Sequence, residues 1–70
     1  MFTYKVDSTS IKAIGYDTSS QVLIVIYVKK GTYKYINVPL IIYQRLAVSK
    51  DKQWYIDKSI DGSYIELKIN

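Results

Sequence analysis

The chain contains no cysteine and no histidine. Without cysteine it forms neither a disulfide nor a thiolate metal site. Without histidine it lacks the commonest general base, the side chain that titrates near neutral pH, and the usual metal ligand. Its serines therefore have no obvious base to activate them. We expect a non-enzymatic protein with no catalytic residues, no metal and no cofactor.

Long apolar runs and export signals are also lacking. No uninterrupted apolar run approaches the ~18 residues of a membrane-spanning helix, so we expect no membrane association. Residues 1–6 lack the charged start and apolar stretch of a signal peptide. A cysteine-free chain without these signals is expected in the cytoplasm. No repeat or linker marks a second domain, so residues 1–70 are expected to form a single domain.

Charge of one sign is in moderate excess. Ten Lys and Arg against six Asp and Glu give a net charge of +4. Nine of the ten cations are scattered lysines, and Arg45 is the only guanidinium. A basic domain of this kind makes a polyanion such as RNA a candidate partner.

The only proline, Pro39, divides the chain into a β half and a largely helical half. Proline fixes its own φ and pushes the preceding residue toward extended geometry, so a strand ends there and a helix can begin with Pro39 in its first turn. We therefore predict an α+β fold: an antiparallel β-meander, then two short helices within residues 39–61, then a C-terminal strand over residues 63–70. That strand is expected to rejoin the sheet, beside residues 2–6.

Residues 22–28 form the strongest predicted strand, because every residue in the run is apolar. In an antiparallel sheet with one solvated face, alternate residues would be polar. Val22, Ile24 and Ile26 therefore lie under the helices, are partly exposed, or pack against another copy of the chain. If the chain self-associates, these three residues are the predicted homo-oligomer interface.

Residues 29–31, Lys-Lys-Gly, connect this strand to the next. A three-residue loop that ends in a left-handed glycine fits better than a two-residue turn, because a lysine resists positive φ. That register pairs Tyr27 with Tyr33 and Val25 with Tyr35. A two-residue loop would instead turn both later tyrosines to the opposite face of the sheet.

After Pro39, apolar residues recur at helical spacing and form two stripes. Ser49 is the expected N-cap of the second helix, and Gly62 stands where a left-handed residue would end it. The stripes comprise Ile42, Tyr43, Leu46 and Ala47 in the first helix and Tyr55, Ile56 and Ile60 in the second.

Two groups of aromatic and lysine residues are candidate nucleic-acid contacts. Tyr33 and Tyr35 place two phenols on one strand face, where they stack on unpaired bases or, alternatively, pack against the neighbouring strand. Trp54 has a lysine four residues away on either side, which gives a Lys-Trp-Lys row on a helix. That row is either a nucleic-acid edge or a cover over the core. The candidate binding residues are Tyr33, Tyr35, Lys29, Lys30, Lys34, Lys50, Trp54 and Lys58.

Several spaced motifs resemble the KTSC domain, a family named after the C-terminal segment of some lysyl-tRNA synthetases and also found as small stand-alone proteins. The resemblance covers Ser10 to about Tyr64. The matching motifs are Ile14-Gly15-Tyr16-Asp17, the central Tyr33-Lys34-Tyr35, Val38-Pro39, Tyr43, Leu46 and the closing Tyr55-Ile56-Asp57-Lys58-Ser59-Ile60. Asp57 departs from the Asn that is usual in the family, and the Gly expected before the closing motif is missing.

The resemblance implies no established activity, since the family has none, and RNA binding is a suggestion made for the family. Together with the basic charge, it favours a small non-enzymatic module that binds RNA or another single-stranded nucleic acid. The alternative is a protein-interaction or self-assembly module.

Overall fold

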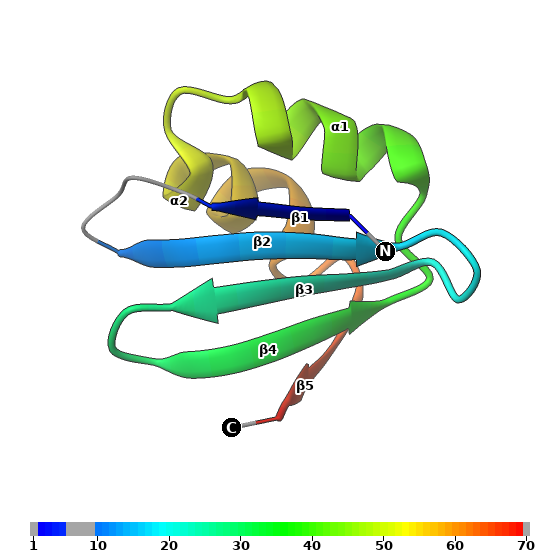
Figure 1. Cartoon of the computed structure of the whole chain (residues 1–70), viewed down its shortest axis with the longest axis horizontal. Coiled ribbons are helices and arrows are strands. Elements are labelled where there is room, and N and C mark those ends of the chain that lie inside the picture. The colour runs from blue at the N-terminus through cyan, green and yellow to red at the C-terminus, as the bar shows by residue number, and fades with distance from the viewer. Residues whose placement is uncertain (1, 6–9, 70) are drawn as a thin grey trace.

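Five strands form one antiparallel sheet in the order β1-β2-β3-β4-β5 (Figure 1). The computed structural model describes residues 2–5, as backbone only, and residues 10–69; Val6 and the polar residues 7–9 lie outside the described residues. The predicted antiparallel meander is confirmed. The strands are β1 (Phe2–Lys5), β2 (Ile11–Asp17), β3 (Val22–Tyr27), β4 (Gly31–Ile36) and β5 (Ile65–Lys68).

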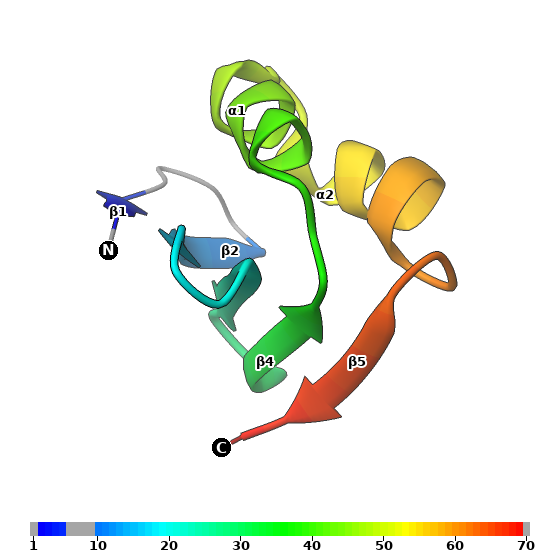
Figure 2. The same ribbon diagram turned by 90° about the vertical axis from the view of Figure 1, so that its right-hand side faces the viewer.

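The helical segment lies between β4 and β5 and covers one face of the sheet (Figure 2). It consists of α1 (Leu40–Val48), α2 (Lys52–Tyr55) and a π-helical turn, η1 (Ile56–Ile60), that continues α2 directly. The helices of the described residues therefore lie within the range predicted from the change of period at Pro39. The result is a two-layer α+β fold, as expected.

The segment around Pro39 links the two layers. Pro39 occupies the N-cap position of α1 with φ −62 and ψ 147, an extended conformation that ends the strand and opens the helix. The Val38 N–H donates to the Gln21 carbonyl at 2.9 Å, and the buried Tyr16 hydroxyl donates to the Val38 carbonyl. The link between strand and helix is thus bonded to the sheet on both sides.

The core lies between the helical layer and the inner face of the sheet. Both predicted helical stripes contribute to it: their most buried members are Tyr43, Leu46, Ile56 and Ile60, and Ile42, Ala47 and Tyr55 pack against the cluster. Burying a large apolar side chain contributes about 1.5–3 kcal/mol. The core from the sheet and the β4–α1 link comprises Ile11, Ile14, Tyr16, Leu23, Val25, Tyr27, Tyr35 and Val38.

The position of β5 differs from the sequence prediction. β5 pairs with β4, at the opposite edge of the sheet from β1, so the expectation that it lies beside residues 2–6 was wrong. The chain leaves η1 through Gly62, whose φ of +82 confirms the predicted left-handed stop. Figure 2 shows the chain then running from the end of the helical segment into β5, which lies beside β4.

The β3–β4 connection also differs in detail. Gly31 has the predicted positive φ, +97, but it pairs with Tyr27, so the loop comprises residues 28–30. The register is shifted by two residues from the prediction and pairs Val25 with Tyr33 and Leu23 with Tyr35. Because side chains alternate with a period of two, this shift leaves both tyrosines on the predicted face.

Asp51, not Ser49, caps the second helix. The Asp51 Oδ1 accepts a hydrogen bond from the Trp54 N–H at 3.0 Å, whereas the Ser49 hydroxyl donates to the Asp51 carbonyl at 3.1 Å. A carboxylate suits this position because it also faces the positive end of the helix dipole. Lys50 therefore precedes the helix, and the predicted row of Lys50, Trp54 and Lys58 is not a helical row.

Candidate functional site

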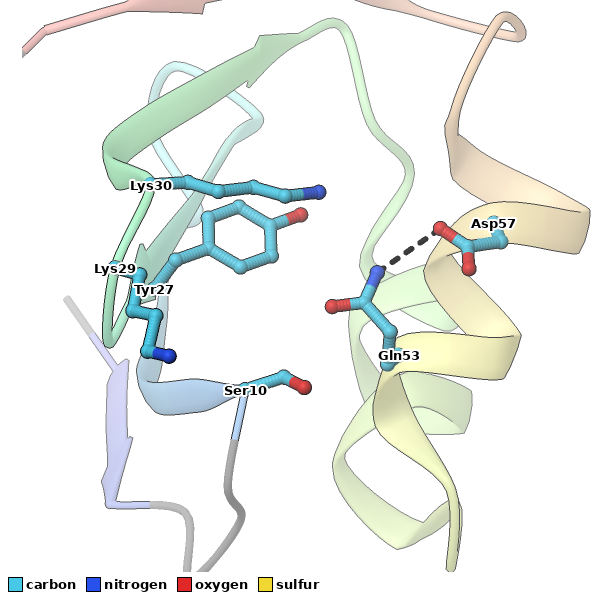
Figure 3. Close-up of a pocket in the computed structure, with 6 residues that line it drawn as sticks. All are labelled: Ser10, Tyr27, Lys29, Lys30, Gln53 and Asp57. Atoms are coloured by element: carbon cyan, nitrogen blue, oxygen red, sulfur yellow. Dashed lines mark hydrogen bonds between the residues drawn. The ribbon is translucent and has the colours of Figure 1, made fainter.

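A pocket of about 540 Å³ lies between the β3–β4 loop and the α2–η1 segment. Its volume falls within the ~300–1,000 Å³ typical of small-molecule sites. Figure 3 shows Tyr27 and Lys30 reaching from the sheet side toward Gln53 and Asp57 on the helical side. The lining residues are Ser10, Tyr27, Lys29, Lys30, Gln53 and Asp57.

The hairpin loop places two cations at this pocket. β3 ends at Tyr27, and the exposed Lys29 and Lys30 follow in the turn that Gly31 completes with its positive φ. The Lys30 Nζ lies 5.1 Å from the centroid of the Tyr27 ring, a cation–π geometry. The ammonium group is thereby held beside the aromatic wall of the pocket (Figure 3).

The helical wall carries hydrogen-bonding groups. The Gln53 Nε2 donates to the Asp57 Oδ1 at 2.9 Å, a contact between residues four apart along the helical segment. Because this bond uses the amide nitrogen, the Gln53 carbonyl oxygen is left pointing into the gap toward Tyr27 (Figure 3). Together with the carboxylate of Asp57, it makes the helical wall rich in acceptors.

Tyrosine hydroxyls connect this pocket to the sheet edge. The Tyr35 hydroxyl donates to the Glu66 Oε2 at 2.8 Å and lies 3.4 Å from the Tyr27 hydroxyl. Burial raises the pKa of Tyr35 far above its usual value, and its hydrogen bonds to Tyr27 and Glu66 raise it further. Burial also raises the pKa of Tyr27.

A second hollow of about 200 Å³ shares Tyr27, Lys30 and Asp57 with the first. The combined site has cations on the hairpin side and carboxylates on the helical side and on β5. Such a site suits a ligand that carries both an anionic group and hydrogen-bond donors. The other residues around the second hollow are Tyr33, Tyr35, Ile56, Asp61 and Glu66.

The structure separates the tyrosines and lysines that the sequence grouped together. Tyr35 is only 1% exposed, so the prediction that it stacks on a base is wrong, and the packing alternative holds because its ring belongs to the core. Tyr33 packs edge-on against Tyr27, with 5.5 Å between ring centroids. Lys34 alternates with both tyrosines and therefore points to the opposite face of the sheet, between Ile24 and Leu67.

The remaining predicted contacts lie on the helical side. Trp54 is 57% exposed, so it does not act as a cover over the core. It directly follows Gln53 in α2 and thus lies on the flank next to the pocket wall. Lys50 and Lys58 are both exposed. Of the predicted lysines, Lys29 and Lys30 line the pocket.

Sequence reasoning missed Ser10, Tyr27, Gln53 and Asp57 as members of one site. The spacing of Gln53 and Asp57 was a usable signal, because polar residues four apart share a helical face. Tyr27 precedes the lysine pair at the end of an inward-facing row, which places its hydroxyl near the loop. Ser10 is brought to the site by the pairing of β2 with β3, which no local pattern reports.

On β3, the residues that face away from the helices are apolar. Val22, Ile24 and Ile26 alternate with the buried residues of β3 and are half-buried on this face. The homo-oligomer interface predicted there stays a prediction. Within residues 2–5 and 10–69, no helix has the length and apolarity to cross a membrane, and no cluster of carboxylates suits a metal ion.

Comparison with known proteins identifies the family. No curated protein matches the chain. The crystal structure of the KTSC domain protein YPO2434 from Yersinia pestis is similar, with a TM-score of 0.93, 31% sequence identity, and coverage of 97% of this chain and 96% of that one. The KTSC domain matches residues 7–64. The chain therefore belongs to the KTSC domain family.

Proposed function

We propose that this domain is a non-enzymatic module that binds single-stranded RNA and holds one unpaired nucleotide in the pocket between the β3–β4 loop and the α2–η1 segment. The observation that supports it most is the position of Lys29 and Lys30 beside a nucleotide-sized pocket whose opposite wall is rich in acceptors. Sequence-specific recognition of RNA commonly uses single strands, whose unstacked bases can enter such pockets.

Each side of the pocket has a defined role in this proposal. Lys29 and Lys30 contact phosphate, for which lysine serves as a point charge. The Gln53 carbonyl and the Asp57 carboxylate accept hydrogen bonds from the amino or imino groups of a base edge. Tyr27 forms the aromatic wall, and its position is fixed by the cation–π contact with Lys30 and by the contact of its hydroxyl with that of Tyr35.

Trp54 supports binding of a neighbouring nucleotide. Its exposed ring lies next to Gln53 on α2, where a base adjacent to the bound nucleotide can stack. Base–aromatic stacking contributes about 1–3 kcal/mol for each base. The net charge of +4 adds a weak attraction for any polyanion.

The experiment measures binding of a short fluorescent single-stranded RNA by anisotropy, from about 20 to 200 mM salt. The Lys29→Gln/Lys30→Gln double variant should bind more weakly and reduce the slope of log K against log salt by about 1.4, from ~0.7 for each lost phosphate contact on a single strand. The matched control is Lys12→Gln/Arg45→Gln, which removes the same charge from β2 and α1. This control should retain nearly all of the affinity.

Base recognition is tested separately with Asp57→Asn. The substitution keeps the size of the side chain but replaces one of its two acceptor oxygens by a donor. Binding to oligocytidylate, whose base presents an amino donor, should therefore fall relative to oligouridylate, whose base presents a carbonyl acceptor at that position. Trp54→Ala should weaken both by ~1–3 kcal/mol. Equal losses of affinity in Lys29→Gln/Lys30→Gln and in Lys12→Gln/Arg45→Gln would show that binding depends only on the net charge. No binding at low salt would refute the proposal.

A further inference from the structure

Strand β5 forms an edge of the sheet and is exposed along its whole length. Ile65, Leu67 and Ile69 are 65%, 47% and 54% exposed, although all three are large and apolar. Exposed edge strands are sites where another strand can add, because one row of backbone N–H and C=O groups has no partner in the sheet. The edge therefore has the features of an interaction surface.

The hydrogen bonds to β4 determine which backbone groups are open. The Ile69 N–H donates to the Thr32 carbonyl at 2.8 Å. Bonded and non-bonded positions alternate in an antiparallel pair, so the backbone N–H and C=O groups of Leu67 and Ile65 also point toward β4. The N–H and C=O groups of Glu66 and Lys68 consequently point away from β4, toward the open edge.

We propose that two copies of this chain associate through their β5 strands, antiparallel and with the two-fold axis at Leu67, so that the two sheets become one. In this register Glu66 of one copy lies opposite Lys68 of the other. These are the residues whose backbone groups are open, so each exchanges N–H···O=C bonds with its counterpart. The inference is independent of the proposed RNA binding.

Charge complementarity argues that the occupant of this edge is a second copy. Residues 65–69 read Ile-Glu-Leu-Lys-Ile, a sequence whose charge pattern complements itself when reversed. The two-fold pairing places each glutamate opposite a lysine, which stabilises an antiparallel pair, whereas like charges directly opposite destabilise it. An isologous contact of this kind closes on itself and yields a dimer, not a filament.

The apolar residues fit the same register. Leu67 lies opposite Leu67 of the second copy, and Ile65 lies opposite Ile69. These are non-hydrogen-bonded positions, where side chains approach most closely. The pairing therefore sets the apolar row of β5 beside the same row of the second copy and continues the outer face of the sheet across the dimer.

This interface differs from the one the sequence predicted. Val22, Ile24 and Ile26 lie on β3, in the middle of the sheet, where every backbone group of the strand faces a neighbour. An edge pairing needs no contact with them. Ile24→Lys is therefore the variant that separates the two interfaces.

Sedimentation equilibrium tests the pairing at protein concentrations up to the millimolar range and at low salt. The mass should rise from 8.1 kDa toward twice that value. Glu66→Lys and Lys68→Glu should each weaken dimerisation by about tenfold or more, because either change places like charges opposite one another. An equimolar mixture of these two variants should form a dimer again, since every opposed pair is then complementary.

Two further variants complete the test. Lys68→Pro removes an N–H that points to the open edge and spares the bonds to β4, so it should remain folded by circular dichroism and be monomeric. Ile24→Lys should leave the dimer intact. A wild-type chain that is monomeric throughout, or single charge variants that dimerise like the wild type, would overturn the proposal. So would a mixture that does not re-associate, or a folded Ile24→Lys variant that is monomeric.

Discussion

Tyr16 offers the sharpest test of how the layers are joined. Its ring is buried and stacks on Tyr43 of α1, with 5.3 Å between centroids and 16° between planes. Its hydroxyl donates to the carbonyl of Val38, which is also buried. Tyr16→Phe keeps the ring stack and removes only this hydrogen bond.

The expected loss of stability follows from the buried carbonyl. A buried acceptor left without a partner costs about 1–3 kcal/mol. With a urea m-value of ~1 kcal/mol/M for a domain of this size, the unfolding midpoint should fall by about 1–3 M. Urea unfolding followed by circular dichroism measures the shift.

Tyr55→Phe is the matched control for Tyr16→Phe. Tyr55 also packs against the core, and nothing among the described residues hydrogen-bonds to its hydroxyl. Its substitution should change the free energy of unfolding by less than about 0.5 kcal/mol. If Tyr16→Phe is as mild as this control, the hydrogen bond to Val38 does not hold the helical layer to the sheet.

Three further predictions concern stability. Leu46→Ala should cost about 2–5 kcal/mol in urea unfolding because Leu46 is fully buried in the core. Ile41→Ala, on the exposed side of α1, should cost less than about 1 kcal/mol, and equal losses would show that the packing of α1 is misassigned. Gln21 has a φ of +56, a conformation that strains a residue with a side chain but not a glycine. Gln21→Gly should therefore raise the free energy of unfolding by about 0.5–1 kcal/mol, and a decrease in that free energy would show that the glutamine is unstrained. Burial raises the pKa of Tyr35 above the usual tyrosine value, so the folded chain keeps a proton that the unfolded chain releases. Stability should therefore be complete below about pH 10 and fall above it by ~1.4 kcal/mol per pH unit for such a tyrosine, and a flat urea profile to pH 11 would contradict this.

The elements of this fold are local and were predictable from the sequence. The change from period two to helical spacing at Pro39 located the helices. The uninterrupted apolar run of residues 22–28 located β3, and the alternation of apolar and charged residues over residues 65–69 located β5. Gly31 and Gly62 marked their turns correctly, because positive φ favours glycine strongly. Asp51 replaced Ser49 as the cap because both residues can accept from a helix N-terminus, and sequence alone does not rank them.

Long-range placement was less predictable. The choice of β4 over β1 as the partner of β5 depends on where the helical segment ends in space, and no local pattern encodes that position. The candidate site shows the same limit. Lys29 and Lys30 were found from composition, whereas Gln53 and Asp57 meet them only through packing. The predicted register placed Tyr35 on the correct face of the sheet, where it is buried, although the predicted strand pairing was wrong by two residues.

A titration of the amide NMR spectrum with a short single-stranded RNA at low salt tests the proposed function most directly. We expect the amides of Ser10, residues 29–31 and residues 53–57 to shift together, with one saturation curve. Amides on the exposed side of α1 should not move. No shifts at low salt, or shifts confined to the outer face of the sheet, would contradict it.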